Sequence, residues 1–169
     1  MTLYITTAID YVNAKPHVGH AYEKVLADVI TRWHRLKGED VYFLTGTDEN
    51  AQKNEEAAKN AGVNTSAFVR QNSALFRKLC DSLQISYNDF IKTTEERHIK
   101  VSQQIFQTLF EMGDVYKGVY KGLYCRGCEA YFTEKDLIDG KCPEHQTAPN
   151  WIEQEHYFSL SVHTGACER

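Results

Sequence analysis

The segment CRGCEAYFTEKDLIDGKCPEH, residues 125–145, constrains the fold more than any other part of the sequence. It places two residues between Cys125 and Cys128 and, after a longer spacer, two residues between Cys142 and His145. Each pair puts two ligands on one tight turn, and three thiolates with one imidazole complete a tetrahedral Zn²⁺ shell. No coordination position is left for water, so the predicted zinc is structural and folds a loop that lacks a core of its own. The alternative of four unrelated residues is disfavoured because two pairs at ligand spacing seldom coincide.

Composition and charge limit the class of protein. The 169-residue chain has a formal net charge of −4, so no global positive field recruits nucleic acid, and we expect no DNA partner. The N-terminal segment resembles neither a secretory signal nor a transit peptide, and no apolar stretch approaches the roughly 20 residues that span a bilayer. Five cysteines, three of them in the segment just described, favour metal binding in a reducing compartment. We therefore expect a cytoplasmic protein without a membrane partner.

The first two thirds of the chain alternate strand and helix patterns. Runs rich in β-branched and aromatic residues predict strands, and apolar residues at spacings of three and four predict helices. The expected elements are a strand at 2–9, a helix at 17–37, a strand at 41–47, helices at 50–61 and 64–83, a short extended piece at 88–91, and a helix from about 93 to 113. This order predicts an α/β fold with a parallel sheet and flanking helices.

Local signals support the limits of these elements. Gly38 and Gly62 stand in the favoured position just past a helix, Asn64 offers an N-cap, and Thr93 with Glu96 has capping-box spacing. In the helix at 17–37 the apolar residues share one face. They are Val18, Tyr22, Val25, Leu26, Val29, Ile30, Trp33 and Leu36.

The pattern changes after Gly113. The segment DVYKGVYKGLYC, 114–125, predicts a hairpin with turns at its glycines, and NWIEQEHYFSLS, 150–161, predicts another strand or hairpin arm. We therefore divide the chain into a first domain at 1–114, a metal-binding region at 115–158 and an unpatterned tail at 159–169.

Two histidines stand where the first strand gives way to the first helix. Pro16 fits the first helical turn, and His17 and His20 are three residues apart, so both project from nearly one face of that turn. Free N–H groups at a helix N-terminus attract anions, and Gly19 allows a ligand close to the backbone. The carboxyl end of a parallel sheet is also where open α/β folds bind ligands. The pair thus indicates a phosphate site; the alternative is two exposed histidines at an ordinary helix start.

A second candidate follows the next strand. In LTGTDEN, residues 44–50, Asp48 could hold an ammonium group beside the histidines if the two strands are neighbours. The alternative is that Thr47 or Asp48 serves as the N-cap of the following helix. The residues alone leave both readings open.

Four segments together are similar to one family. TTAIDYVNAKPHVGHAY, residues 6–22, resembles the first signature of class I aminoacyl-tRNA synthetases. FLTGTDEN at 43–50, TTEERH at 93–98 and GLYCRGCEAYFTEKDLIDGKCPEH at 122–145 look like methionyl-tRNA synthetases of the bacterial form with one zinc knuckle. The resemblance runs in order from about residue 3 to residue 158. It implies the N-terminal half of a Rossmann-like catalytic domain, followed by the start of a connective insertion that carries the knuckle.

The resemblance also implies an activity. Members of this family are methionine–tRNA ligases, which use ATP with Mg²⁺ to convert methionine into methionyl-adenylate and then charge tRNA(Met). In this reaction a carboxylate attacks the α-phosphorus of ATP and pyrophosphate leaves, which needs positioning and charge stabilisation more than covalent help.

Individual roles carry over onto matching positions of this sequence. His17 and His20 match the catalytic histidines that bind the ATP phosphates, and Gly19 matches the glycine against which adenine packs. Ile9 and Tyr11 match residues that line the methionine side-chain pocket. Asp48 matches the aspartate that holds the α-ammonium group of methionine, and the four knuckle residues match the ligands of one structural zinc.

The sequence departs from the family pattern at several positions. Ala8 and Asp10 stand where Pro and Tyr are expected, and Asn50 and Ala51 stand where His-Gly is common. Ala8 and Asp10 predict an altered strand exit beside the methionine pocket, and Asn50 and Ala51 bear on the fine geometry of the site. The second half of the sheet, the Lys-Met-Ser-Lys-Ser loop and the anticodon-binding domain are also missing. We therefore expect a fragment or a truncated frame with little or no aminoacylation activity of its own.

Other classes of function remain open from the sequence. A small nucleotidyltransferase also uses a His-x-Gly-His element at a strand–helix turn, but has no zinc knuckle with these flanks. A catalytically incomplete, non-enzymatic binding fragment is a third reading. A class I synthetase for cysteine, leucine or valine is the nearest alternative within the same class.

Overall fold

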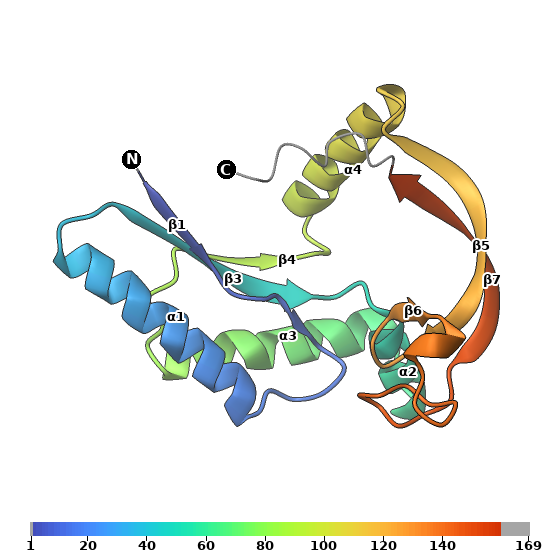
Figure 1. Ribbon diagram of the computed structural model, residues 1–169. Coiled ribbons are helices and arrows are strands. Elements are labelled where there is room, and N and C mark those ends of the chain that lie inside the picture. Colours follow the sequence, from blue (N-terminus) through green and yellow to red (C-terminus); the bar gives the residue numbers. More distant parts are fainter. Residues whose placement is uncertain (1, 160–169) are drawn as a thin grey trace. The chain divides into compact units, whose positions relative to one another are not determined.

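The computed structural model describes residues 2–159 (Figure 1). The chain forms two compact units that divide between Ile99 and Lys100. This division lies within a helix, whereas the sequence places a domain boundary near residue 114, at the end of that helix; the domain assignment stays a prediction. The predicted tail at 159–169 lies outside the described residues except for the backbone of Ser159.

The first unit is built on a parallel sheet, as predicted. Its central strand β3 pairs on one side with β1 and then with β2, and on the other side with β4. The pairs Leu3↔Val41, Asp10↔Thr47 and Gly46↔Ile91 set the register. The strands are β1 (Leu3–Thr6), β2 (Asp10–Tyr11), β3 (Val41–Asp48) and β4 (Asp89–Lys92). The single strand expected at 2–9 is therefore shorter, and a second short strand forms in a stretch that was expected to be irregular.

Three helices of the first unit agree with the sequence patterns. They are α1 (Val18–Leu36), α2 (Gln52–Asn60) and α3 (Thr65–Ser82). Gly38 and Gly62 adopt positive φ angles of 81° and 68° just past α1 and α2, where only glycine avoids strain. The side chain of Asn64 caps α3 by accepting a hydrogen bond from the N–H of Ala67. Pro16 was expected in the first turn of α1 but precedes its N-cap, because the side chain of His17 takes the capping position.

Helices α1 and α3 lie on the same side of the sheet (Figure 1). Between them and the sheet is one apolar core. Its buried members are Val12, Ala27, Phe43, Val69, Phe76, Cys80, Ile85 and Phe90. Cys80 was expected in the core and is there.

The face of α1 that contacts this core is not its apolar face. The buried residues of the helix are Lys24, Ala27, Asp28 and Thr31. The apolar residues at helical spacing are instead mostly exposed, for example Trp33 at 61% and Val29 at 58%. Hydrogen bonds explain the orientation: Asp28 accepts from the N–H and the hydroxyl of Ser86, and Arg35 donates to the carbonyl of Ser86. Polar contacts to the segment before β4 thus fix which side of α1 is buried.

The second unit is an antiparallel sheet of order β6-β5-β7. The remaining elements are α4 (Glu96–Glu111), β5 (Val115–Cys125), β6 (Ala130–Phe132), the short helix η1 (Glu134–Asp136) and β7 (Asn150–Ser159). The hairpin predicted at 114–125 is wrong: β5 is one continuous strand that pairs with β7 from Val115 to Tyr124. Gly122 serves packing and not a turn, because a Cβ there would lie 2.8 Å from Tyr120 and 2.9 Å from Tyr131.

The capping box predicted from Thr93 and Glu96 is also wrong. Helix α4 begins at Glu96, so Thr93 lies too early to be its N-cap. The hydroxyl of Thr93 accepts a hydrogen bond from the N–H of Glu49 at 2.8 Å and donates to Asp48 Oδ1 at 3.4 Å. Thr93 therefore links β4 to the end of β3.

Candidate active site and metal centre

The turn into α1 is held by its two histidines. His17 is the N-cap, and its Nδ1 accepts a hydrogen bond from the N–H of Gly19 at 3.0 Å. The Nδ1 of His20 accepts from the N–H of His17 at 3.1 Å. The two imidazoles thus cap the helix reciprocally, as Ser and Glu do in a capping box. Because a neutral imidazole has one donor and one acceptor nitrogen, both rings carry their proton on Nε2.

The surroundings of His20 favour this neutral form. Burial lowers the pKa of His20 most strongly; the neighbouring His17 and Lys24 lower it further, while Asp10 and Glu23 oppose the shift. Its ring lies 3.9 Å from that of His17 and packs edge-on against Phe76, with centroids 4.9 Å apart. The first turn of α1 contains no acidic residue. The helix start therefore offers imidazole N–H donors in addition to the partial positive charge of a helix N-terminus, a combination suited to an anion.

A cavity of about 390 Å³ opens at this turn. It brings together Ile9, Tyr11, His17 and His20 from the predicted site. The other lining residues are Ala8, Asp10, Asn13, Ala14 and Lys15. Gly19 and Asp48 do not line it: Gly19 is exposed in the first turn of α1, and Asp48 ends β3 in register with Tyr11.

Asp48 does not cap the next helix. The N-cap of α2 is Ala51, which makes no side-chain capping bond, so the alternative that Thr47 or Asp48 caps that helix is wrong. Asp48 Oδ1 accepts hydrogen bonds from the N–H of Asn50 at 3.0 Å and from Thr93, while Thr47 is fully buried and bonds to Ser73. The carboxylate of Asp48 is thus held at the carboxyl end of the sheet, next to Tyr11.

Sequence reasoning missed the contributions of Glu23, Lys24 and Lys53 at the site. Lys24 is 1% exposed and lies within ion-pair distance of Asp10 and Glu23. Lys53 places its ammonium 3.3 Å from the ring centroid of Tyr11, a cation–π contact that restricts the tyrosine. The available signal was that Lys24 falls on the opposite side of α1 from the apolar stripe.

The predicted metal ligands converge in the second unit. The ligand atoms of Cys125, Cys128, Cys142 and His145 all lie within 4.8 Å of one another. Cys128 Sγ is 3.4 Å from Cys142 Sγ and 3.2 Å from His145 Nδ1, and Cys142 Sγ is 3.9 Å from that nitrogen. Tetrahedral bonds of about 2.3 Å to sulfur would separate two thiolates by about 3.8 Å. The donor set and its spacing therefore fit a Zn²⁺ ion held through Nδ1 of the histidine.

Backbone geometry explains how these ligands meet. Cys125 ends β5 and Cys142 is held by a hydrogen bond from its N–H to the carbonyl of Thr147 at 2.9 Å. A Cβ at residue 127 would lie only 2.4–2.6 Å from ring atoms of His145. Gly127 in the first turn therefore lets the imidazole approach the thiolates.

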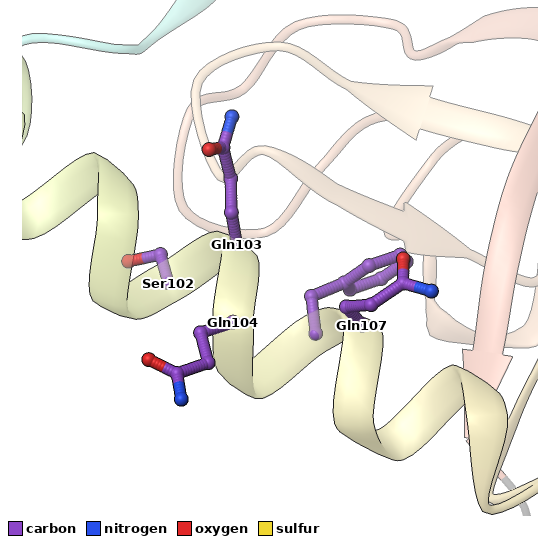
Figure 2. A pocket seen from close by; sticks show the side chains of 5 residues that line it. Ser102, Gln103, Gln104 and Gln107 are labelled. Atoms are coloured by element: carbon purple, nitrogen blue, oxygen red, sulfur yellow. The ribbon is translucent and has the colours of Figure 1, made fainter.

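A larger cavity lies elsewhere, on α4. It measures about 720 Å³ and is lined by Ser102, Gln103, Gln104, Phe106 and Gln107 of α4. Figure 2 shows that Gln103 and Gln104 project to different sides of the helix. Since its lining has no ionisable side chain, this pocket does not compete with the histidine turn as a catalytic site.

The sequence and the fold are similar to those of known proteins. The family model described as "tRNA synthetases class I (M)" matches residues 3–158. The methionine–tRNA ligase of Thermotoga maritima is 45% identical over 162 residues, covering 94% of this chain and 26% of that protein. That of Caldanaerobacter subterraneus is 44% identical over 157 residues, covering 93% and 25%. The chain therefore spans about a quarter of the length of these curated relatives.

Solved structures show the same similarity of fold. Mycobacterium tuberculosis methionyl-tRNA synthetase in complex with methionyl-adenylate superimposes with a TM-score of 0.87 at 42% identity, covering 94% of this chain and 32% of that one. A LeuRS–tRNA–LeuAMS complex from Agrobacterium radiobacter gives a TM-score of 0.75 at 19% identity, a likeness of fold alone. The parallel sheet and the histidine turn thus define a class I tRNA synthetase. Within that class, the chain belongs to the methionyl-tRNA synthetase family.

In residues 2–159, no helix is both long enough and apolar enough to cross a bilayer.

Proposed function

We propose that this chain supplies the methionine-activating site of a methionine–tRNA ligase, which forms methionyl-adenylate from methionine and ATP and charges tRNA(Met). The observation that carries the proposal is the histidine turn, where two neutral imidazoles present Nε2–H donors at a helix N-terminus beside Ile9 and Tyr11. The negative charge that builds on the phosphates in the transition state requires such donors in fixed positions.

Each predicted site residue has a role in this proposal. His17 and His20 bind the ATP phosphates and stabilise the charge that develops at the α-phosphorus, and Gly19 leaves room for adenine. Ile9 and Tyr11 contact the methionine side chain, and Asp48 holds its α-ammonium group. Loss of one fixed donor to such a transition state typically lowers kcat by about 10²–10³-fold.

The remaining parts of the proposal concern the metals and the setting. Zn²⁺ at Cys125, Cys128, Cys142 and His145 is structural, because the four ligands fill its shell, and Mg²⁺ enters as the ATP complex. A cytoplasmic location also belongs to the proposal.

A chimera tests the activity. Residues 1–158 would replace the matching N-terminal segment of the Thermotoga maritima enzyme, which is 45% identical there. We expect ATP–pyrophosphate exchange that depends on methionine and not on leucine, valine or cysteine, and a loss of about 10²-fold or more in the His20→Asn variant. Exchange with another amino acid, or none in a folded chimera, would refute the proposal.

Two measurements separate the remaining readings. About one zinc per chain supports the synthetase over a small nucleotidyltransferase. The isolated 169-residue chain is assayed beside the chimera. We expect little or no exchange from it; robust methionine-dependent exchange would contradict the expectation that it is catalytically incomplete.

A further inference from the structure

We propose that Asp10 is a positioning residue for His20, and that the consecutive residues Glu23 and Lys24 hold Asp10 and the strand exit in place. The proposal deepens the proposed function and rests on it, since His20 is one of its two catalytic histidines. Its test is independent of substrate binding.

The first observation is the buried ammonium of Lys24. The residue is 1% exposed, and an unpaired charge at such a position would be costly. Its Nζ donates to the carbonyl of Ala8 at 2.9 Å and to Glu23 Oε2 at 2.9 Å. It also lies 3.0 Å from Asp10 Oδ2, an ion pair that is not aligned as a hydrogen bond. Three oxygens therefore surround a group that has three protons to donate.

The second observation is that both backbone groups of Ala8 are held by α1. Its N–H donates to Glu23 Oε1 at 3.0 Å, and its carbonyl accepts from Lys24. Ala8 lies in the break between β1 and β2 and belongs to neither strand. A proline at this position would have no N–H to donate. Glu23 and Lys24, which are adjacent on α1, thus fix the path of the chain from β1 to the cavity, next to Ile9.

The third observation places Asp10 between the lysine and the histidine. Asp10 is 7% exposed and is paired with Thr47 of β3. One carboxylate oxygen faces Lys24, and the other, Oδ1, lies 4.0 Å from His20 Nε2. The imidazole has little freedom to turn, because its Nδ1 already accepts from the N–H of His17. The negative charge of Asp10 therefore favours the proton on Nε2, the nitrogen that remains to donate to a ligand.

Groups of both charges act on this carboxylate, but burial has the largest effect on its pKa. Burial raises the pKa of Asp10, and Lys24 and His20 counter that effect while Glu23 adds to it. Asp10, Glu23 and Lys24, together with His17, are the ionisable groups that act on His20. Removing the charge of Asp10 removes the main influence that opposes the burial of His20. The variant Asp10→Asn should therefore lower the pKa of His20 and weaken its preference for the Nε2–H tautomer.

Nuclear magnetic resonance of the 169-residue chain tests the proposal. Long-range ¹H–¹⁵N correlation spectra report the tautomer and the titration midpoint of each histidine. In the unsubstituted chain we expect His20 as the Nε2–H tautomer. In Asp10→Asn we expect a lower midpoint and the appearance of the Nδ1–H tautomer, and in Asp10→Glu recovery towards the original values. Asp89→Asn, which removes a carboxylate on β4 that pairs with Arg97, should change neither.

The outcomes decide the proposal without any activity assay. If His20 in the unsubstituted chain is mainly the Nδ1–H tautomer, the proposal is overturned even if no variant folds. A folded Asp10→Asn chain with unchanged tautomer and midpoint overturns it as well. Glu23→Gln should speed amide exchange at Ala8 and leave the tautomer of His20 unchanged. If Glu23→Gln affects the tautomer as strongly as the amide exchange, then Asp10, Glu23 and Lys24 have a purely structural role and the proposal is overturned. Failure of the proposed function would appear in the chimera assay, where these spectra play no part.

Discussion

At the scale of single residues, the site depends on groups that hold one another. His17 and His20 each use one nitrogen to cap α1 and keep the other as a donor. Gly19 makes this possible, because a Cβ there would lie 2.9 Å from Cε1 and 3.0 Å from Nδ1 of His17. A side chain at this position would therefore move the imidazole.

The variant Gly19→Ala tests this dependence. We expect ATP–pyrophosphate exchange by the chimera to fall by about 10²-fold, since one fixed donor is displaced. The stability of the chain should fall by only about 1 kcal/mol, the usual cost of a lost cap. Exchange kinetics and thermal denaturation measure the two effects. Val18→Ala, at a neighbouring position with an 84% exposed side chain, is the control, and equal exchange rates in the two variants would contradict the argument.

Asp28 illustrates a residue whose role is stability. It is buried, and it accepts hydrogen bonds from Ser86 and from Arg32 Nε at 2.7 Å. Burial raises its pKa, but the hydrogen bonds from Ser86 and Arg32 outweigh that effect and lower the pKa overall. The folded state thus binds a proton less readily than the unfolded state. The stabilisation is therefore present above the unfolded pKa near 3.8 and is lost as pH falls through the lower folded value.

Replacement of this carboxylate should be costly. We expect Asp28→Ala to lower the free energy of unfolding at pH 7 by about 2–3 kcal/mol, because buried donors lose a charged acceptor. The difference from the unsubstituted chain should shrink as the pH falls below about 4. Urea denaturation at several pH values measures this, with the exposed Glu55→Gln as control. A difference that does not change with pH would show that the charge of Asp28 contributes nothing.

At the scale of elements, glycines decide close approaches. Gly122 of β5 makes room for the ring of Tyr120 in the same strand and of Tyr131 in β6, and Gly127 makes room for the imidazole of a candidate metal ligand. Because glycine has no side chain, neither residue contributes to the hydrophobic periodicity of the sequence. The sequence pattern therefore predicted a hairpin where β5 is one continuous strand. In both places the requirement comes from a neighbour that is distant in the sequence or on another strand.

The variant Gly127→Ala should weaken zinc binding. A methyl group at 2.4 Å from His145 Cδ2 would push the ring away, and disturbed ligand support typically costs 10–100-fold in metal affinity. Competition with a chromophoric chelator measures the affinity, and Lys135→Ala on the exposed surface of the same region is the control. Unchanged affinity would mean that the imidazole is not a ligand in this position.

Helix α1 exposes most of its apolar face. Its apolar stripe is regular, yet Tyr22, Val29 and Trp33 are each more than half exposed. Apolar surface of this extent on a helix favours association.

We expect the isolated chain to self-associate through this stripe. Val29→Lys should shift the sedimentation profile towards monomer at the same concentration, because it places a charge in the apolar surface. Val63→Lys replaces a half-exposed valine outside α1 and is the matched control. If both variants behave alike, the stripe has no special part in association.

At the scale of the whole molecule, the chain consists of two compact units with different sources of stability. The first unit has an apolar core between sheet and helices. The buried side chains described in the second unit include the candidate metal ligands Cys125 and Cys142, so we expect its order to depend on a bound metal ion to a greater degree.

Zinc removal should therefore act on one unit only. We expect treatment with a strong chelator to abolish amide protection in β6 and in the knuckle end of β5 and β7, while β1, β3 and β4 remain protected. Hydrogen exchange followed by mass spectrometry resolves these segments, and restored protection after zinc is added back controls for damage. Simultaneous loss of protection in β3 would show that the two units unfold together.

Much of this architecture was predictable because it is local. Apolar spacing, caps and terminal glycines indicated α1, α2 and α3 to within a few residues, and the order of strands and helices indicated the parallel sheet. The metal ligands were predictable because paired spacing is itself the geometric requirement. The continuous β5, the role of Thr93 and the charged cluster around Lys24 were not, since each depends on a partner far along the chain.

The sequence by itself determined most of the helices and strands of the first unit, the candidate metal-binding residues and the family, because these follow from residue types at fixed spacing. Only the tertiary structure decided which face of α1 is buried and which nitrogen of each histidine remains free to donate. Periodicity records which residues share a face but not what covers it. A histidine in a sequence has two equivalent possibilities, and only the hydrogen bonds of Gly19 and His17 choose between them.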